Sequence, residues 1–263
     1  MSKPFPEASP ANQSTSPRGV TADPAPAVPV PQKLLLWLTY GVAGTVLFPT
    51  VYLIEGATRP GYNPWQQAIS TLSLGPGGWI QRANFIMCGV SVIWLAFVWR
   101  QILRGGVCAR WYPIVRGIEG LALVAIGFFS TDPAPGYPPG TVVVSTTLQG
   151  TIHLVFTIII VNAMALGLFI IARRFWRDPN FRGWATYSVI SGLLTLVFIW
   201  AFGVANASHS PYSGIFERLA TSTDTVWGAV LLIPLWAGRR LMRPEGIHGN
   251  RLLASPPWRG GRA

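Results

Sequence analysis

The sequence predicts an all-α, polytopic membrane protein built as a bundle of six transmembrane helices. Six long apolar segments recur along the 263 residues, half of which are hydrophobic and only 11% charged. About 20 apolar residues are enough for a helix to cross a bilayer. The connections between these segments are alternately rich and poor in Lys and Arg. A transmembrane β-barrel is disfavoured, because its strands would be short and would alternate polar with apolar residues.

The predicted spans have a fixed orientation. They cover residues 34–54, 79–103, 112–131, 146–172, 184–206 and 221–241. All but three of the 20 Lys and Arg residues lie in the tails, in the second and fourth connections, or at the span ends that border them. The exceptions are Arg59, Arg82 and Arg218. Because short cytoplasmic loops carry an excess of Lys and Arg, we expect a multi-pass protein of the cell (inner) membrane with both termini in the cytoplasm.

Two tails flank the predicted transmembrane domain, which covers residues 32–242. Residues 1–31 hold eight prolines and few large apolar residues, which predicts a disordered cytoplasmic tail. Residues 243–263 are rich in Gly, Pro and Arg and predict a second, basic disordered tail. The net charge of +11 is explained by topology and by contact with membrane lipids, so no nucleic-acid partner is expected.

The first outer connection predicts a short interfacial helix. Asn63 is a good N-cap and Pro64 suits the first helical position, so a helix should run over residues 64–73. Trp65, Ile69 and Leu72 then share one face, which favours a helix that lies on or dips into the membrane. The alternative is a cap that seals the outer end of the bundle and binds nothing.

The same connection carries a resemblance to a known family. The runs Arg-Pro-Gly-Tyr-Asn-Pro at 59–64, Ile-Ser-Thr-Leu-Ser-Leu-Gly at 69–75 and Gly-Trp-Ile-Gln-Arg-Ala-Asn-Phe at 78–85 carry its signature. Together with residues 132–133, 150–153 and 214–218, they resemble an uncharacterised prokaryotic family of six-helix membrane proteins, the domain of unknown function nine-nine-eight. The resemblance covers roughly residues 34–242. It implies an inner-membrane location and six helices, and it supplies neither an activity nor a catalytic residue.

Ionisable residues gather at the predicted outer side. Asp132 ends the third span, because the following proline disfavours further helix. His153 lies about two turns into the fourth span, where ionisable groups usually face the bundle interior or a wet cavity. It either joins two helices as a neutral imidazole or serves an outward-open pocket as a base or proton relay. Glu217 and Asp224 share one stripe of the last span, with Arg218 beside it.

These patterns define the candidate site residues. The catalytic candidates are Asp132, His153 and Glu217. The candidate ligand-binding residues are Glu55, Arg59, Tyr62, Ser70, Arg82, Asp132, His153, His209, Glu217, Arg218 and Asp224. No metal or cofactor is expected, because the sequence has no His-x-x-x-His or Cys-x-x-Cys spacing and no phosphate-binding glycine loop.

Three functions remain open at this point. The first is an outward-facing polar cavity that binds a small molecule or a lipid head group. The second is an intramembrane hydrolase, with or without a metal, that uses Asp132 and His153. The third is a proton-linked permease with His153 and Asp224 as the relay. Arg116 and Glu119 are predicted to pair near the cytoplasmic interface, where long side chains reach toward water, and a gate or proton site is the alternative there.

Overall fold

The computed structural model describes residues 29–103, 105–134, 136–142 and 145–238. Except for residues 29–31, the predicted tails lie outside the described residues. Six long α-helices and two short 3₁₀ helices make up the described chain. They are α1 (Gln32–Thr58), η1 (Ile69–Ser73), α2 (Gly78–Ile102), α3 (Gly106–Phe128), α4 (Leu148–Trp176), η2 (Pro179–Phe181), α5 (Arg182–Ala207) and α6 (Ser213–Trp236). The prediction of an all-helical protein with six long helices is confirmed.

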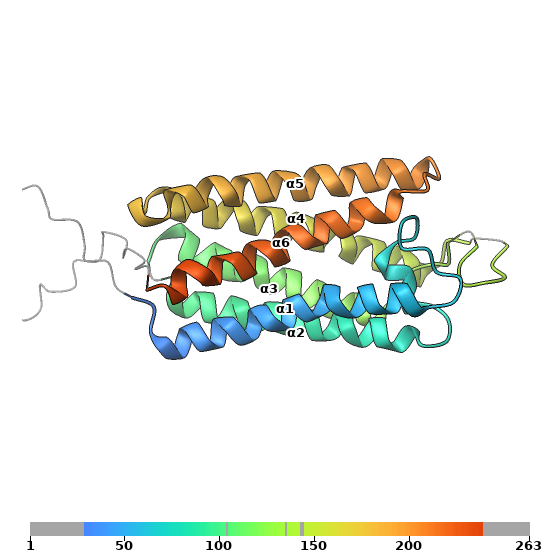
Figure 1. The fold of residues 1–263 in the computed structure, drawn as a ribbon, viewed down its shortest axis with the longest axis horizontal. Coiled ribbons are helices and arrows are strands. Elements are labelled where there is room, and N and C mark those ends of the chain that lie inside the picture. Colours follow the sequence, from blue (N-terminus) through green and yellow to red (C-terminus); the bar gives the residue numbers. More distant parts are fainter. Residues whose placement is uncertain (1–28, 104, 135, 143–144, 239–263) are drawn as a thin grey trace, which may run out of the picture.

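The six long helices form a closed, antiparallel ring (Figure 1). Each helix packs against the next one in the sequence, and α6 packs against α1. The short connections at residues 103–105, 177–181 and 208–212 favour this up-and-down arrangement, because helices joined by so few residues must lie side by side. A consequence is that α3 and α6 face each other across the ring.

The two ends of the bundle differ in charge. At one end lie the α1–α2, α3–α4 and α5–α6 connections, with few basic residues; we call it the arginine-poor end. The α2–α3 and α4–α5 connections lie at the opposite, arginine-rich end, where the described chain also begins and ends (Figure 1). Connections rich and poor in basic residues thus lie at opposite ends of the bundle, as the distribution of Lys and Arg in the sequence predicts.

The surface of the ring is apolar. Large apolar side chains such as Leu53, Phe97, Leu121 and Trp200 are exposed along its length, and such a surface is rare on proteins that face water. Helices α1 to α5, the last together with η2, are long and apolar enough to cross a membrane. Helix α6 does not meet this criterion. The chain therefore has the features of a multi-pass membrane protein, with five candidate spans among the described residues.

The first connection differs from its prediction. In place of a helix over residues 64–73, only η1 forms, and its Ile69 and Leu72 are 1% and 0% exposed in the interior of the bundle. Trp65, which was predicted to share their face, is 57% exposed. The segment is therefore a cap that packs against α1, α2 and α6, and not a helix lying along the membrane surface.

The interior divides into two apolar clusters. The cluster at the arginine-rich half includes the buried residues Trp99, Tyr112, Phe175 and Leu231. The cluster at the arginine-poor half, which includes Phe48, Phe85, Ile126 and Ile160, also lines a cavity. A larger cavity thus lies in the arginine-poor half, whereas the cluster in the other half lines a small cavity of about 20 Å³.

Candidate functional site

Three cavities follow one another along the bundle axis. The vestibule, about 340 Å³, lies at the arginine-poor end between the first connection, α4 and α5, and the exposed residues Asn206 and His209 are part of its rim. The middle cavity, about 80 Å³, lies within the ring. The inner cavity has a volume of about 20 Å³, enough for about one water molecule.

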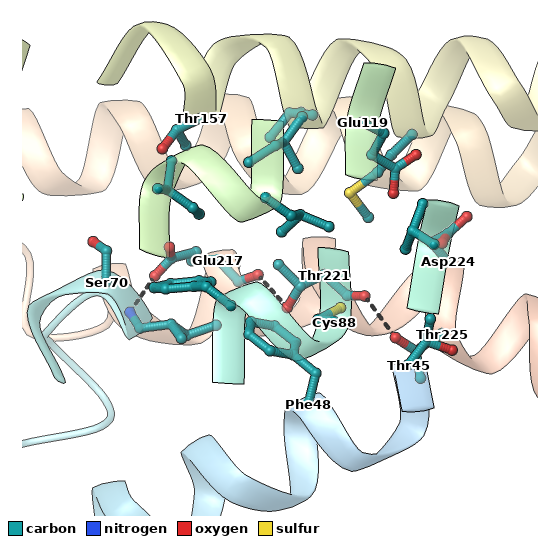
Figure 2. A pocket seen from close by; sticks show the side chains of 18 of the residues that line it. Thr45, Phe48, Ser70, Cys88, Glu119, Thr157, Glu217, Thr221, Asp224 and Thr225 are labelled. Carbon is teal, nitrogen blue, oxygen red and sulfur yellow. Dashed lines mark hydrogen bonds between the residues drawn. The ribbon is translucent and has the colours of Figure 1, made fainter. Parts of the chain in front are cut away.

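Shared lining residues show that these cavities adjoin. Vestibule and middle cavity share Ser70, His153, Thr157 and Glu217. The middle and inner cavities share Thr45 and Asp224. Figure 2 shows Ser70, Thr157 and Glu217 at one end of the middle cavity and Glu119 with Asp224 at the other. The cavities therefore lead from the arginine-poor end to the centre of the bundle.

The middle cavity has apolar walls and polar ends. Its apolar lining residues are Phe48, Ile69, Phe85, Val92, Leu123, Ile126, Ile160, Val161, Met164 and Ile199. A few polar groups at fixed positions within such walls are typical of small-molecule sites.

His153 lies at the junction of vestibule and middle cavity. Its Nδ1 atom lies 2.6 Å from the carbonyl oxygen of Phe129. Because a carbonyl only accepts hydrogen bonds, Nδ1 carries the hydrogen, and Nε2 is the nitrogen left for the cavity. The hydrogen bond joins α4 to the end of α3. This agrees with the first interpretation of His153, a neutral imidazole that joins two helices.

Glu217 and Arg218 are neighbours on α6 with different surroundings. Glu217 faces both larger cavities and accepts a hydrogen bond from the backbone N–H of Ile69 at 2.6 Å. Arg218 lies against the first connection, where it donates to the carbonyl oxygen of Gln67 and to the hydroxyl of Tyr62. Burial raises the pKa of Tyr62, so this hydroxyl stays neutral and donates in turn to the Ala68 carbonyl. Arg218 and Tyr62 thus hold the cap onto α6.

Asp132 holds Thr147, the N-cap residue of α4, in place. Its carboxylate accepts hydrogen bonds from the backbone N–H and the hydroxyl of Thr147, and Thr147 in turn accepts from the backbone N–H of Gly150. Both carboxylate oxygens of Asp132 are therefore engaged in helix capping, although the residue also lines the vestibule.

Replacement of Gly150 by alanine should disturb this cap. A methyl group at Gly150 would overlap the carboxylate of Asp132, which would have to leave Thr147. We expect a loss of about 0.5–2 kcal/mol, the usual worth of a helix N-cap, measured by thermal unfolding in detergent. Gly183→Ala, near the start of α5 and with no neighbouring atom in reach, is the matched control. An equal effect of both changes would contradict the capping role of Asp132.

The remaining charged candidates lie away from the three cavities. Arg59 pairs with Glu55 and donates to the carbonyl oxygens of Leu74, Pro76 and Gly77, so it fixes the end of the first connection. Arg82 is exposed and lines none of the three.

His209, in contrast, is exposed and stands on the rim of the vestibule, with a left-handed backbone at φ 54°. The structure therefore does not bring Arg59, Arg82 and Arg218 together with the cavity-facing acids.

An ionic cluster that was not predicted from the sequence lies where the middle cavity meets the inner cavity. Arg116 of α3 donates to both carboxylate oxygens of Asp224 of α6, at 2.8 and 2.9 Å. Its Nη1 atom is also 3.0 Å from Glu119. The side chains of these three residues, which we call the triad, are 5%, 10% and 3% exposed, in that order. The triad joins opposite helices through the centre of the ring.

The sequence-based prediction for Arg116 and Glu119 was half right. Their ion pair is confirmed, but its expected position near the cytoplasmic interface is wrong. The third helix begins at Gly106 rather than at residue 112, which moves Arg116 from the helix start to its third turn. Asp224 could have indicated the buried position of Arg116, because an acid within a transmembrane span requires a partner.

No metal site is evident in the described part of the chain. Among those residues, no three His, Cys, Asp or Glu side chains gather closely enough to hold a metal ion. The two cysteines, Cys88 in the middle cavity wall and Cys108 near the arginine-rich end, are free thiols.

Comparison with known proteins places the chain in a family. No curated protein and no solved structure matches it. The sequence pattern of one family, described as proteins of unknown function, matches residues 42–234. That range begins within α1, ends within α6, and contains the triad and nearly all the cavity-lining residues. The chain therefore belongs to the DUF998 family of proteins of unknown function.

Proposed function

We propose that this protein binds a small molecule within its helix ring, in a cavity that opens on the non-cytoplasmic side of the cell membrane. The observation that carries this proposal is the succession of vestibule and middle cavity, which leads from the arginine-poor end to the buried triad. Toward the other end, members of the apolar cluster, among them Trp99, Tyr112 and Leu231, line the inner cavity of about 20 Å³, which has room for about one water molecule. A cavity that is wide at one end and narrows toward the other suits a solute-binding protein.

The proposal includes α6 as a sixth span. Its exposed face carries Val226, Val230 and Ile233, which suit contact with lipid. Its polar residues lower the hydropathy of the helix, and several of them, including Thr221, Asp224 and Thr225, line the middle cavity instead. The polar composition of α6 thus reflects the cavity rather than a helix outside the membrane.

The proposed orientation follows from the basic residues. The connections at the arginine-rich end contain Arg100, Arg110, Arg173, Arg174 and Arg177 or lie next to them. This end should therefore face the cytoplasm, with both termini, and the vestibule should face outward.

Binding is favoured over hydrolysis by the position of Asp132. A hydrolase that used Asp132 and His153 would need the carboxylate free to act, whereas Asp132 holds Thr147 at the start of α4. An anionic lipid head group is also disfavoured, because Arg59 and Arg218 bind backbone carbonyl groups of the first connection.

Cysteine labelling from outside the cell tests the proposal. With Cys88 and Cys108 replaced by alanine, Thr157→Cys places a thiol where vestibule and middle cavity meet. A membrane-impermeant thiol reagent should label it in intact cells, because thiolates form and react only where water has access.

The neighbouring residue provides the control. Ile158→Cys lies at the same depth but faces outward, with Ile158 55% exposed on the lipid-facing surface, and should stay unlabelled. Gly183→Cys, at the start of α5, should react only after the cells are broken. Equal labelling at positions 157 and 158, or labelling at 183 in intact cells, would contradict the cavity or its orientation.

A further inference from the structure

The triad has more acid than base. With all three groups ionised, Arg116 supplies one positive charge, and Glu119 with Asp224 supplies two negative charges. In the low-dielectric interior of a bundle an uncompensated charge is costly, so a fourth, positive partner would stabilise the cluster.

Among the described residues, no other fixed cation faces the triad. The titratable groups that face the triad are Cys88 of α2 and Tyr112 of α3, while Thr45 of α1 and Ile199 of α5 carry no charge. His153 of α4 and Glu217 of α6 stand at the far end of the same cavity. The positive partner therefore has to come from outside the described chain, as a proton or as part of a ligand.

Glu119 is the member of the triad whose carboxylate can still accept a hydrogen bond from such a positive partner. Both oxygens of Asp224 already accept hydrogen bonds from Arg116. Glu119 Oε2 is in ion-pair contact with Arg116 but accepts no hydrogen bond, although the residue is 98% buried. Glu119 also lines the middle cavity (Figure 2). A donor that enters from the cavity can thus reach an incompletely bonded carboxylate.

The cavity wall defines the rest of the ligand. Between Glu217 at the mouth and Glu119 at the inner end, the wall consists largely of Ile, Val, Leu, Phe and Met side chains. The volume of about 80 Å³ restricts the part of the ligand that lies there to a few non-hydrogen atoms. These features suit an aliphatic chain that ends in an ammonium group, which combines a positive charge with N–H donors.

We propose that the triad is a site at which a small alkylammonium ligand and a proton bind in exchange at Glu119. In the empty protein the proton on Glu119 neutralises the triad. When the ligand enters, its ammonium group replaces that proton as the positive partner: the carboxylic acid releases H⁺ to water and the resulting carboxylate accepts an N–H bond. Charge is conserved, because one cation enters the site and one leaves it. This inference rests on the proposed function, since it names the ligand class of the same cavity.

Titration calorimetry with n-butylammonium tests the exchange. The full-length protein in lipid nanodiscs is titrated in buffers of different ionisation enthalpy, between about pH 5 and 8. Binding should release about one proton per ligand at the acidic end of this range, and the affinity should rise about tenfold per pH unit there. 1-Butanol and butyrate, which match the chain but lack the positive charge, should bind at least about tenfold more weakly.

Two variants separate proton exchange from simple charge attraction. Glu119→Gln keeps the shape of the side chain but cannot exchange a proton, so both proton release and pH dependence should disappear. Glu55→Gln removes a buried acid that also pairs with an arginine but lines none of the three cavities, and it should behave as the parent protein does.

The possible outcomes distinguish this inference from the proposed function. If butylammonium binds without proton release, or if release persists in Glu119→Gln, the exchange is overturned while the binding cavity stands. If butylammonium binds no better than 1-butanol, the ligand class is overturned. The labelling of Thr157→Cys reports independently whether the cavity itself is open.

Discussion

Arg116→Met is expected to destabilise the folded protein by about 3–5 kcal/mol, the usual cost of removing one partner from a buried ion pair. Arg116 binds both oxygens of Asp224 and contacts Glu119 in the centre of the ring. Without it, two buried carboxyl groups would face each other with no fixed cation. Chemical or thermal unfolding in detergent, followed by circular dichroism, measures the loss.

A matched change on the same helix serves as the control. Arg110 lies six residues earlier on α3 and is exposed, beside the ring of Trp111. Arg110→Met should change stability by less than about 0.5 kcal/mol.

Removal of the whole triad's charge sharpens the comparison. The triple variant Arg116→Met, Glu119→Gln, Asp224→Asn has no buried charge left at this site, so it should recover most of the stability lost in Arg116→Met. A loss in Arg116→Met as small as that in Arg110→Met would show that the ion pair does not hold α3 and α6 together.

The helices, and the alternation of arginine-rich and arginine-poor connections between them, could be predicted from the sequence because both depend on local composition. Length, apolar content and the distribution of arginines are properties of each segment and its flanks. They predicted the six long helices and which connections lie at the same end of the bundle. The start of α3 was misplaced for the same reason. Arg110 and Arg116 suggest a cytoplasmic connection when only neighbouring residues are considered, whereas the acid that accommodates Arg116 lies 108 residues later, on α6.

The first connection shows how tertiary contacts override a local signal. Asn63 does accept a hydrogen bond from the backbone N–H of Trp65, as its capping character predicts. The helix does not continue, because α6 engages the carbonyl of Gln66 through Ser213 and the N–H of Ile69 through Glu217. No pattern within residues 59–78 contains that information.

The sequence pointed to individual residues that line the cavities, but not to the balance of acidic and basic groups around them. Ser70, His153 and Glu217 do meet, at the junction of two cavities. The binding of Arg59 and Arg218 to backbone carbonyls could not be predicted from local patterns, since it depends on the path of the first connection. With these arginines bound elsewhere, most of the ionisable side chains that line the described cavities are acids, and this shifts the expected ligand from an anionic head group to a cation.

The contact between α2 and α3 gives the second prediction of large effect. Gly89 and Gly120 face each other so closely that a methyl group on either would lie 2.6–2.7 Å from the carbonyl oxygen of the other. Small residues permit such close approach between membrane helices. Because the obstacle is backbone, it cannot turn away as a side chain would. Gly120→Ala should therefore cost about 1–3 kcal/mol through overpacking.

Gly117 is the control for this prediction, one turn earlier on α3 and with no atom within 4 Å of an added methyl group. Gly117→Ala should leave stability unchanged or raise it by up to about 1 kcal/mol, because alanine favours the helix over glycine. The two changes add the same methyl group to the same helix, so intrinsic helix propensity contributes equally to both. Opposite signs in their unfolding free energies can then arise only from packing against α2, whereas equal signs would mean that α2 and α3 do not approach each other at Gly89.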